Sequence, residues 1–349
     1  MCNGSNHGES ICFIIPPYIL KELAMRGQGE AREAALETLV RSAQLHGRRE
    51  LVSLLPAARA LNTGTKRRTI YDAKNGTQLP GTLVRTEGGK ASKDVAVNEA
   101  YTGSGTVYDF FKRIYNRNSI NDAGLRLDST VHYDRNYDNA FWDGQQRVYG
   151  DGDGVIFQRF TKSLDVIGHE LTHGVTQYEA GLEYMNQPGA LNEHFSDVFG
   201  SLVKQWKRKQ SADKADWIIG EGLFAKGING VGIRSMKAPG TAYDDPRLGK
   251  DPQPAHMRDL YRGRQDNGGV HINSGIPNHA FYLAAVAIGG NAWEKAGRIW
   301  YVALRDRLRQ RSNFKQAAAL IIAVAGELYG AGSNELKAVQ SAWKAVGVI

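Results

Sequence analysis

The pentapeptide HELTH at residues 169–173 restricts the fold of its segment more than any other feature of the chain. Two histidines four positions apart present both imidazole rings on one face only when the backbone between them is helical. Glu170 then lies one position round the helix, within reach of a water molecule on a metal bound by His169 and His173. The motif therefore predicts a helix, which we place over residues 163–180, and a zinc site on it.

A later pair of carboxylates can supply the third zinc ligand and a group that orients one of the two imidazoles. Glu193 and Asp197 lie four residues apart in the segment 190–209, which we predict to be a second helix. Glu193 is the expected third zinc ligand, and Asp197 can orient an imidazole through its free ring nitrogen. Three protein ligands leave the fourth zinc position open for water, as in catalytic sites. His194 is an alternative ligand, but in a regular helix it points off this face.

Hydrophobic periodicity divides the rest of the chain into a β-rich part and a helical part. Alternating patterns bounded by turn-forming residues predict strands over residues 68–73, 82–88 and 129–134, and a hairpin over 147–157. Helical spacing of apolar residues predicts helices over residues 274–289, 291–311, 313–329 and 334–346. Strands followed by helices predict an α+β fold.

The N-terminal segment cannot fold by itself. Residues 1–18 predict an irregular arm that ends in Pro16, Pro17 and Tyr18, and residues 29–45 predict an amphipathic helix. One helix and an arm cannot bury a core, so this segment is expected to dock on the remainder of the chain.

Net charge excludes one class of partner and leaves the others open. The formal net charge is +8, but the lysines and arginines are scattered, without a basic helix that has interleaved aromatic residues. We therefore expect no nucleic-acid partner. Cys2 and Cys12 are the only cysteines, so no disulfide stabilises the main body. Two free thiols near a terminus are the simpler interpretation, and a thiolate that reaches the zinc of an inactive precursor is the alternative.

The N-terminus also bears on where the protein acts. It lacks a basic region followed by a long apolar run, so no standard signal peptide is expected. No stretch approaches the ~20 apolar residues that cross a bilayer, so no membrane partner is expected either. We expect synthesis in the cytoplasm, with action there or after export by a non-standard route.

Several separate motifs, in one order, resemble the thermolysin family of zinc metalloendopeptidases. They are HELTH, GALNEHFSD at 189–197, NAFWDGQQRVYGDGDG at 139–154, GIRSM at 232–236 and DNGGVHINSGI at 266–276. The short segment with PPY further resembles the propeptide of the protealysin-like branch. The resemblance implies a propeptide at 1–50, a linker with the processing region at 51–66, a β-rich catalytic domain at 67–181 and a helical catalytic domain at 182–349.

The resemblance assigns roles to single residues of this sequence. It implies that His169, His173 and Glu193 bind zinc, that Glu170 is the general base, and that Asp197 is the partner of His169. It further implies that His271 and Tyr184 stabilise the oxyanion, with Asp266 orienting His271. The residues that align the substrate backbone would be Asn139, Ala140 and Arg234. The pocket for the residue after the cut bond would be lined by Phe157, Phe160, Val166 and Ile233. Phe160 is bulkier than expected and would make that pocket shallower.

A calcium site that is frequent in the family is expected to be absent. Asp165, Asp216 and Glu221 match carboxylates of that site, but Lys204 and Ile218 replace two others. Calcium needs six to eight oxygen ligands and binds more tightly as their negative charge increases, so an ammonium in the cluster would exclude it. The run GDGDG at 150–154 also has the look of a calcium loop, but Asp-Gly pairs beside β-forming residues favour a tight turn.

The sequence therefore predicts a zinc endopeptidase made as an inactive precursor. It would hydrolyse peptides on the amino side of apolar residues by means of a zinc-bound water that Glu170 activates. The extended arm with Pro16, Pro17 and Tyr18 would lie in the substrate cleft as an intramolecular inhibitor, and the enzyme would be a monomer. The alternatives are an N-terminal domain that is never removed, a zinc aminopeptidase, a catalytically silent peptide-binding protein and a nucleic-acid binder.

Overall fold

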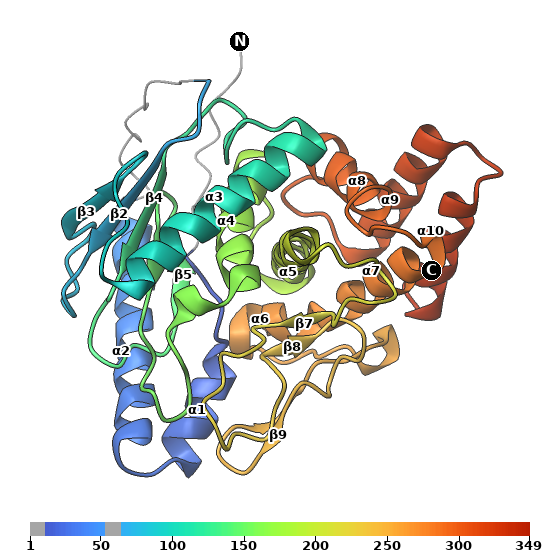
Figure 1. Cartoon of the computed structure of the whole chain (residues 1–349). Coiled ribbons are helices and arrows are strands. Elements are labelled where there is room, and N and C mark those ends of the chain that lie inside the picture. The colour runs from blue at the N-terminus through green and yellow to red at the C-terminus, as the bar shows by residue number, and fades with distance from the viewer. Residues whose placement is uncertain (1–10, 53–63) are drawn as a thin grey trace.

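The computed structural model describes residues 11–52 and 64–349, and Figure 1 shows the arrangement of its elements. A six-stranded mixed sheet forms the N-terminal half, in the order β1-β5-β6-β4-β2-β3. Its strands are β1 (Cys12–Phe13), β2 (Arg68–Asp72), β3 (Thr82–Thr86), β4 (Leu127–Val131), β5 (Ala140–Trp142) and β6 (Arg147–Tyr149). The edge strand β1 comes from the N-terminal arm and pairs antiparallel with β5.

Helices cover this sheet and dominate the C-terminal half. Helix α3 (Val95–Tyr115) packs on strands β2 and β4 and on α4 (Leu164–Tyr178), and α4 packs on α5 (Asn186–Arg208). Figure 1 shows α5 end-on near the centre of the molecule, with the N-terminal helices on one side and the last helices on the other. The later helices are α6 (Gln265–Asn273), α7 (Gly275–Ile288), α8 (Ala296–Val302), the π-helical η3 (Ala303–Arg307), α9 (Phe314–Tyr329) and α10 (Asn334–Ala345).

Short elements connect these helices. They are the 3-10 helices η1 (Phe160–Lys162) and η2 (Met257–Asp259) and the strands β7 (Ile218–Ile219), β8 (Arg234–Ser235), β9 (Asp244–Asp245) and β10 (Gly249–Lys250). Strand β7 pairs with β8, and β9 pairs with β10, each antiparallel. Among the described residues, none of the helices combines the length and apolar character that a membrane span requires.

The predicted hairpin over 147–157 is wrong. Strand β6 pairs antiparallel with the preceding strand β5 and parallel with β4, so the hairpin lies earlier in the chain. The residues after β6 form a loop in which the Oδ1 of Asp153 accepts hydrogen bonds from the amides of Val155, Ile156 and Phe157. The loop therefore contains an Asx-type turn.

Helix α3 was not predicted because glycines and β-branched residues interrupt its pattern. Gly103 and Gly105 lie inside the helix, where glycine ordinarily weakens it. Here a Cβ on Gly103 would lie 2.4 Å from the side chain of Ile167, and one on Gly105 would lie 2.3 Å from that of Arg68. The glycines therefore allow α3 to lie close to its neighbours.

The N-terminal segment is more regular than its sequence suggests. After β1, helix α1 (Pro17–Arg26) begins directly at the proline pair, with Pro16 as its N-cap, and packs against α2 (Gly29–Val52). Proline suits the first helical position, because the missing amide hydrogen would have had no partner there. The irregular arm predicted over residues 1–18 is therefore wrong at Cys12–Phe13, which form β1, and from residue 17 onward, and residues 1–10 lie outside the described part.

A histidine bridges the sheet to the start of α3. The Nδ1 of His132, directly after β4, lies 2.7 Å from Asp151, and its Nε2 lies 2.8 Å from Asp94. Asp94 is also the N-cap of α3. The hydrogen bond with Asp151, reinforced by Asp94, raises the pKa of His132 to about 9 although partial burial opposes the shift.

We expect the free energy that this bridge contributes to depend on pH. Because the folded pKa exceeds the unfolded value of about 6.5, the stabilisation is complete below pH 6.5 and is lost as the pH rises through 9. In a Glu170→Gln background, which prevents autolysis, His132→Asn should lower the free energy of unfolding at pH 6 by about 1 kcal/mol, allowing for solvent screening. Urea titrations at pH 6, 8 and 10 should show this difference shrinking, and a constant difference would contradict the assignment.

Candidate metal centre and substrate cleft

Two glycines let the helices that carry the predicted ligands cross closely. A Cβ on Gly168 in α4 would lie 2.9 Å from the Cα of Gly200 in α5, and one on Gly200 would lie 2.5 Å from the carbonyl oxygen of Asp165. No larger residue fits either position without separating the helices. This close crossing brings the HELTH motif of α4 against the carboxylates of α5.

The three predicted ligands meet at this crossing. The side chains of His169, His173 and Glu193 are buried, and one ligand atom from each lies within 4.8 Å of the others. The Nε2 atoms of His169 and His173 each lie 3.4 Å from an oxygen of Glu193. Two ligands at ~2.1 Å from a tetrahedral zinc ion are about 3.4 Å apart, so this separation suits zinc.

Unsatisfied polar atoms at the same point support a cation. The Oε2 of Glu193 is buried and has no hydrogen-bond partner within the described part of the chain, where its nearest imidazole nitrogens are Nε2 of His169 at 3.4 Å and Nε2 of His271 at 3.5 Å. A buried carboxylate oxygen without a donor is costly unless a cation neutralises it. Two imidazoles and one carboxylate are the donor set of catalytic zinc sites, so the residues present fit the ion that the motif predicts.

Each histidine ligand is held from its far side. The Nδ1 of His169 lies 2.9 Å from Asp197, and the Nδ1 of His173 lies 2.9 Å from Asn192 and 3.1 Å from Ser196. These contacts fix the rings with Nε2 toward the ligand cluster. Asn192 and Ser196 were missed from the sequence, although both fall on the predicted second helix beside the proposed ligand.

Asp197 connects the metal cluster to the substrate side of the cleft. Its two oxygens accept hydrogen bonds from Nε and Nη2 of Arg234, each at 2.8 Å, and from Nδ2 of Asn278 at 2.9 Å. Burial by itself raises the pKa of Asp197, but Arg234 and His169 outweigh it and hold that pKa below its ordinary range. The carboxylate of Asp197 is therefore ionised, and it fixes the side chains of His169 and Arg234.

Glu170 has the environment of a general base. Its side chain is fully buried, and neither carboxylate oxygen has a hydrogen-bond partner among residues 11–52 and 64–349. Burial raises the pKa of Glu170 to about 8 when only the protein groups act on it. A bound cation would favour the ionised form and lower this pKa.

The predicted oxyanion groups lie on the other side of the cluster. The Nδ1 of His271 lies 2.6 Å from Asp266, and its Nε2 lies 3.2 Å from the hydroxyl of Tyr184, which also bonds Glu193. Burial lowers the pKa of His271, but Asp266 and Glu193 outweigh it and raise that pKa. The Nε2 of His271 lies 2.8 Å from the carbonyl oxygen of Phe13, which can only accept, so this nitrogen is the donor.

The N-terminal arm occupies the cleft between these groups. The carbonyl oxygen of Phe13 lies 2.8 Å from Nε2 of His271, and that of Ile14 accepts a hydrogen bond from Nη1 of Arg234 at 3.1 Å. The amide of Ile14 donates to the carbonyl oxygen of Ala140 at 3.1 Å.

Asn139 forms hydrogen bonds with both backbone groups of Ile15, the next residue of the arm. Its Oδ1 accepts from the amide of Ile15 at 2.9 Å, and its Nδ2 donates to the carbonyl of Ile15 at 3.1 Å. Every group predicted to align a substrate backbone therefore contacts the arm. The backbone hydrogen bonds fall on Phe13, Ile14 and Ile15, whereas the predicted contact residues Pro16, Pro17 and Tyr18 lie at the start of α1, which contacts α6.

The side chains predicted to form the specificity pocket are all inside the protein. Phe157, Phe160, Val166 and Ile233 are fully buried in the main hydrophobic core of the protein. The rings of Phe157 and Phe160 lie 5.9 Å apart between centroids. An apolar lining of this kind favours apolar substrate side chains.

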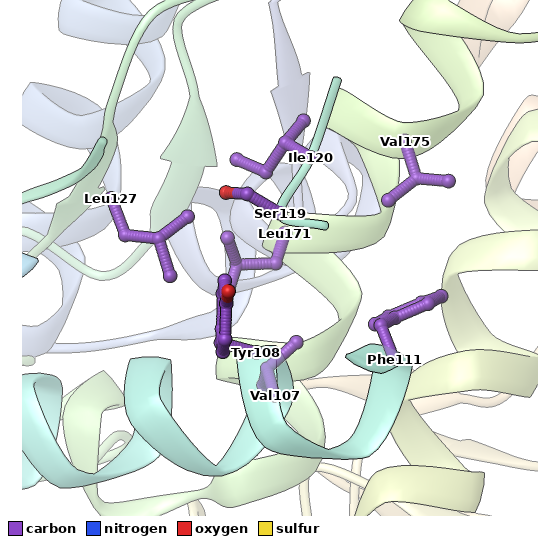
Figure 2. A pocket seen from close by; sticks show the side chains of 8 residues that line it. All are labelled: Val107, Tyr108, Phe111, Ser119, Ile120, Leu127, Leu171 and Val175. Atoms are coloured by element: carbon purple, nitrogen blue, oxygen red, sulfur yellow. The ribbon is translucent and has the colours of Figure 1, made fainter. Parts of the chain in front are cut away.

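Figure 2 shows a separate cavity that does not belong to this site. It lies between α3, α4 and the loop before β4, and its volume is about 10 Å³, which suits no more than a single water molecule. The lining is Val107, Tyr108, Phe111, Ser119, Ile120, Leu127, Leu171 and Val175. Leu171 is the apolar underside of the HELTH motif, so this cavity is a packing gap behind the site.

Comparison with known proteins agrees with this geometry. Residues 57–177 match the thermolysin metallopeptidase catalytic domain, and residues 180–348 match the thermolysin metallopeptidase alpha-helical domain. The chain belongs to the thermolysin metallopeptidase family. It is therefore a metalloprotease, and the predicted α+β fold of this family is confirmed.

Full-length relatives resemble the chain almost from end to end. It is 53% identical over 343 residues to an extracellular metalloprotease of Pectobacterium carotovorum subsp. carotovorum, covering 97% of this chain and 96% of that protein. It is 50% identical to Protease PrtS of Photorhabdus sp. (strain Az29), covering 96% and 91%. A solved structure, the precursor of protealysin from Serratia proteamaculans, is similar with a TM-score of 0.89 and 54% identity over 97% of this chain and 100% of that one.

Replacing Glu170 by Gln tests the separation of metal binding from catalysis. The amide keeps the size of the side chain but cannot accept a proton from water, and Glu170 is not among the three ligands. We expect one zinc ion per chain by elemental analysis, as in the wild type, and a fall in hydrolysis of a blocked peptide by roughly 10²–10⁴-fold. Substantial activity in this variant, or loss of its zinc, would refute the role.

Proposed function

We propose that this chain is the inactive precursor of a zinc endopeptidase that cuts on the amino side of apolar residues and is blocked by its own N-terminal segment. The observation that carries the proposal is the arm in the cleft. His271, Arg234 and Asn139, which would bind a substrate, all bond the backbone of the arm instead. The solved structure that resembles this chain is itself described as a precursor.

The chemistry divides among the residues of the site. When bound, zinc supplies a Lewis acid that polarises the substrate carbonyl and lowers the pKa of the attacking water. Glu170 accepts the proton of that water and delivers it to the leaving nitrogen. His271 and Tyr184 donate hydrogen bonds to the carbonyl oxygen as its negative charge develops. Arg234 and Asn139 hold the backbone beyond the cut bond.

The path of the arm favours an endopeptidase over an aminopeptidase. Cys12 and Phe13 pair with β5 before the site, and Ile14 and Ile15 are bonded after it. The cleft therefore accepts chain on both sides of the reacting position, whereas an aminopeptidase must end at a group that holds a free amine. The intact Glu170 likewise favours an enzyme over a silent peptide-binding protein.

Helix α2 fixes the arm to the catalytic part. The buried Oγ1 of Thr38 accepts from the amide of Asp138, and Arg41 forms an ion pair with Asp134 at 2.9 Å. We infer a propeptide at 1–50 and a processing region at 51–66. Residues 53–63 of that region lie outside the described part of the chain. We also infer a monomer that acts on peptides and proteins, without nucleic acid or membrane as a partner.

Breaking the α2 contact should relieve the inhibition. We expect Thr38→Arg, which places a large charged side chain in this buried contact, to raise the activity of the uncut precursor on a blocked peptide at least about tenfold, since the arm then leaves the cleft more often. Glu33→Arg introduces the same side chain at an exposed position of α2 away from the Arg41–Asp134 ion pair and is the matched control. Intact mass must show uncut chains, and equal activities of the two variants would contradict the proposal.

We further propose that a lysine takes the place of calcium near the start of α4. The Nζ of Lys204 lies 2.9 Å from Asp165 and 2.8 Å from Asp216, and it donates to the carbonyl of Ile218 at 2.6 Å. Lys204 and Asp165 are both buried. The ammonium therefore supplies the positive charge that these carboxylates need, and it leaves too few free oxygens for a calcium ion.

Removing this lysine should destabilise the protein without abolishing zinc binding. Lys204→Met leaves the buried Asp165 without its cation, which should cost about 3–5 kcal/mol of unfolding free energy. Lys207→Met on the exposed face of the same helix is the matched control and should change little. Added calcium should leave the melting temperature of the wild type unchanged. A rise with calcium, or a tightly bound ion at Asp216 and Glu221, would refute the proposal.

A further inference from the structure

The arm runs through the cleft in one direction with one register. His271 and Tyr184 are the groups placed to stabilise the oxygen of the carbonyl under attack, and the carbonyl that His271 contacts at 2.8 Å is that of Phe13. The bond that follows this carbonyl, Phe13–Ile14, therefore lies at the reacting position.

The flanking contacts fix this register independently. Strand pairing sets Phe13 opposite Phe141, and the amide of Ile14 then reaches the carbonyl of Ala140 at 3.1 Å. The carbonyl of Ile14 meets Arg234. A slip by one residue would turn every arm side chain to the opposite face. The side chain of Ile14 is fully buried and belongs to the main hydrophobic core of the protein.

The amino-acid sequence alone could not identify this bond. Phe13, Ile14 and Ile15 are all apolar, so a preference for an apolar residue after the cut allows cleavage before any of the three. Only the hydrogen bonds of the arm distinguish among the three bonds.

We propose that the precursor hydrolyses its own Phe13–Ile14 bond and that this cut does not open the cleft. The inference rests on the proposed endopeptidase function. Water adds to the Phe13 carbonyl carbon, the carbon–nitrogen bond breaks, and a proton passes to the nitrogen of Ile14. The products are a carboxylate at Phe13 and an amine at Ile14, so the reaction needs water alone.

The cut leaves the chain after it in place. Ile14 and Ile15 keep their bonds to Arg234 and Asn139, and α1 begins two residues later. The contact of Thr38 on α2 is equally unaffected by the cut. The new amine therefore stays beside the new carboxylate, and the reverse reaction at this high effective concentration makes net cleavage slow. Activation still requires a second cut, in the processing region.

A mixed-label experiment tests the position of the cut and its intramolecular origin. Zinc-loaded wild-type precursor is mixed with an equal amount of ¹⁵N-labelled Glu170→Gln precursor, incubated at several dilutions and followed by intact-mass spectrometry. We expect residues 1–13 to be lost from unlabelled chains only, at a rate that does not depend on dilution. A first cut before Phe13 or before Ile15, equal cleavage of labelled chains, or a rate that rises with concentration would each overturn the proposal.

Two variants and one activity measurement complete the test. Ile14→Gly removes the side chain from the main hydrophobic core and should slow this cut by at least about tenfold. Val40→Ala, at an exposed position of α2, should leave its rate unchanged. Chains that have lost residues 1–13 but keep the processing region should cut a blocked peptide within about twofold of uncut chains, and a larger rise would overturn the claim that the cleft stays closed.

Failure of the proposed function gives a different result from failure of this inference. If added trypsin removes the N-terminal segment and the zinc-loaded enzyme still cuts no peptide, the endopeptidase assignment itself is wrong. If that enzyme cuts peptides before apolar residues but the precursor never loses residues 1–13, only the self-cleavage is overturned.

Discussion

The buried carboxylate of Asp197 links the parts of this site. It contacts the ring of His169, which is a metal ligand, and it forms two hydrogen bonds with Arg234, which holds the arm. All three side chains are fully buried. Breaking a buried pair of this kind typically costs about 3–5 kcal/mol, because one charge is left without a partner. The position of the substrate-binding arginine is therefore coupled to the geometry of the metal centre.

The inhibition uses the same interactions as substrate binding. The arm adds an edge strand to the sheet beside β5 and continues across the metal cluster, so its backbone satisfies the donors and acceptors that a peptide substrate would meet. Its C-terminal end is held in place, since α1 and α2 follow it directly in the chain and pack against one another. A short segment can therefore block the cleft without large affinity, because its effective concentration is high.

Site residues close together in the sequence could be predicted from local spacing, whereas site residues far apart in the sequence could not. Helical spacing placed His169 with His173 on one helix face and Glu193 with Asp197 on another, and the need of a zinc site for a third ligand then predicted that the two faces meet. The roles of His271 and Arg234 came only from family resemblance, because α6 and β8, which carry these side chains, are distant in the sequence from the HELTH motif. Asn278, which also holds Asp197, gave no signal in the sequence.

The errors have a similar cause. Helix α3 was not predicted because Gly103 and Gly105 weaken its helical pattern. These glycines make room for Ile167 and Arg68, which are distant in the sequence, so a local pattern gives no sign of them. The hairpin was misplaced because the pairing partner of β6 precedes it in the chain. Pro16 and Pro17 indicated the arm, and because they begin α1, the backbone hydrogen bonds to His271, Arg234 and Asn139 come from the three residues before them.

Amide hydrogen exchange of the Glu170→Gln precursor tests the central claim most directly, because neither the arm nor the processing region is cut in that variant. The account predicts slow exchange at the amides of Ile14 and Ile15, which donate to Ala140 and Asn139. It also predicts that an added Arg234→Ala change accelerates both. Exchange of these amides at the rate of an unstructured peptide would show that the arm does not occupy the cleft, and the account of inhibition would then be wrong.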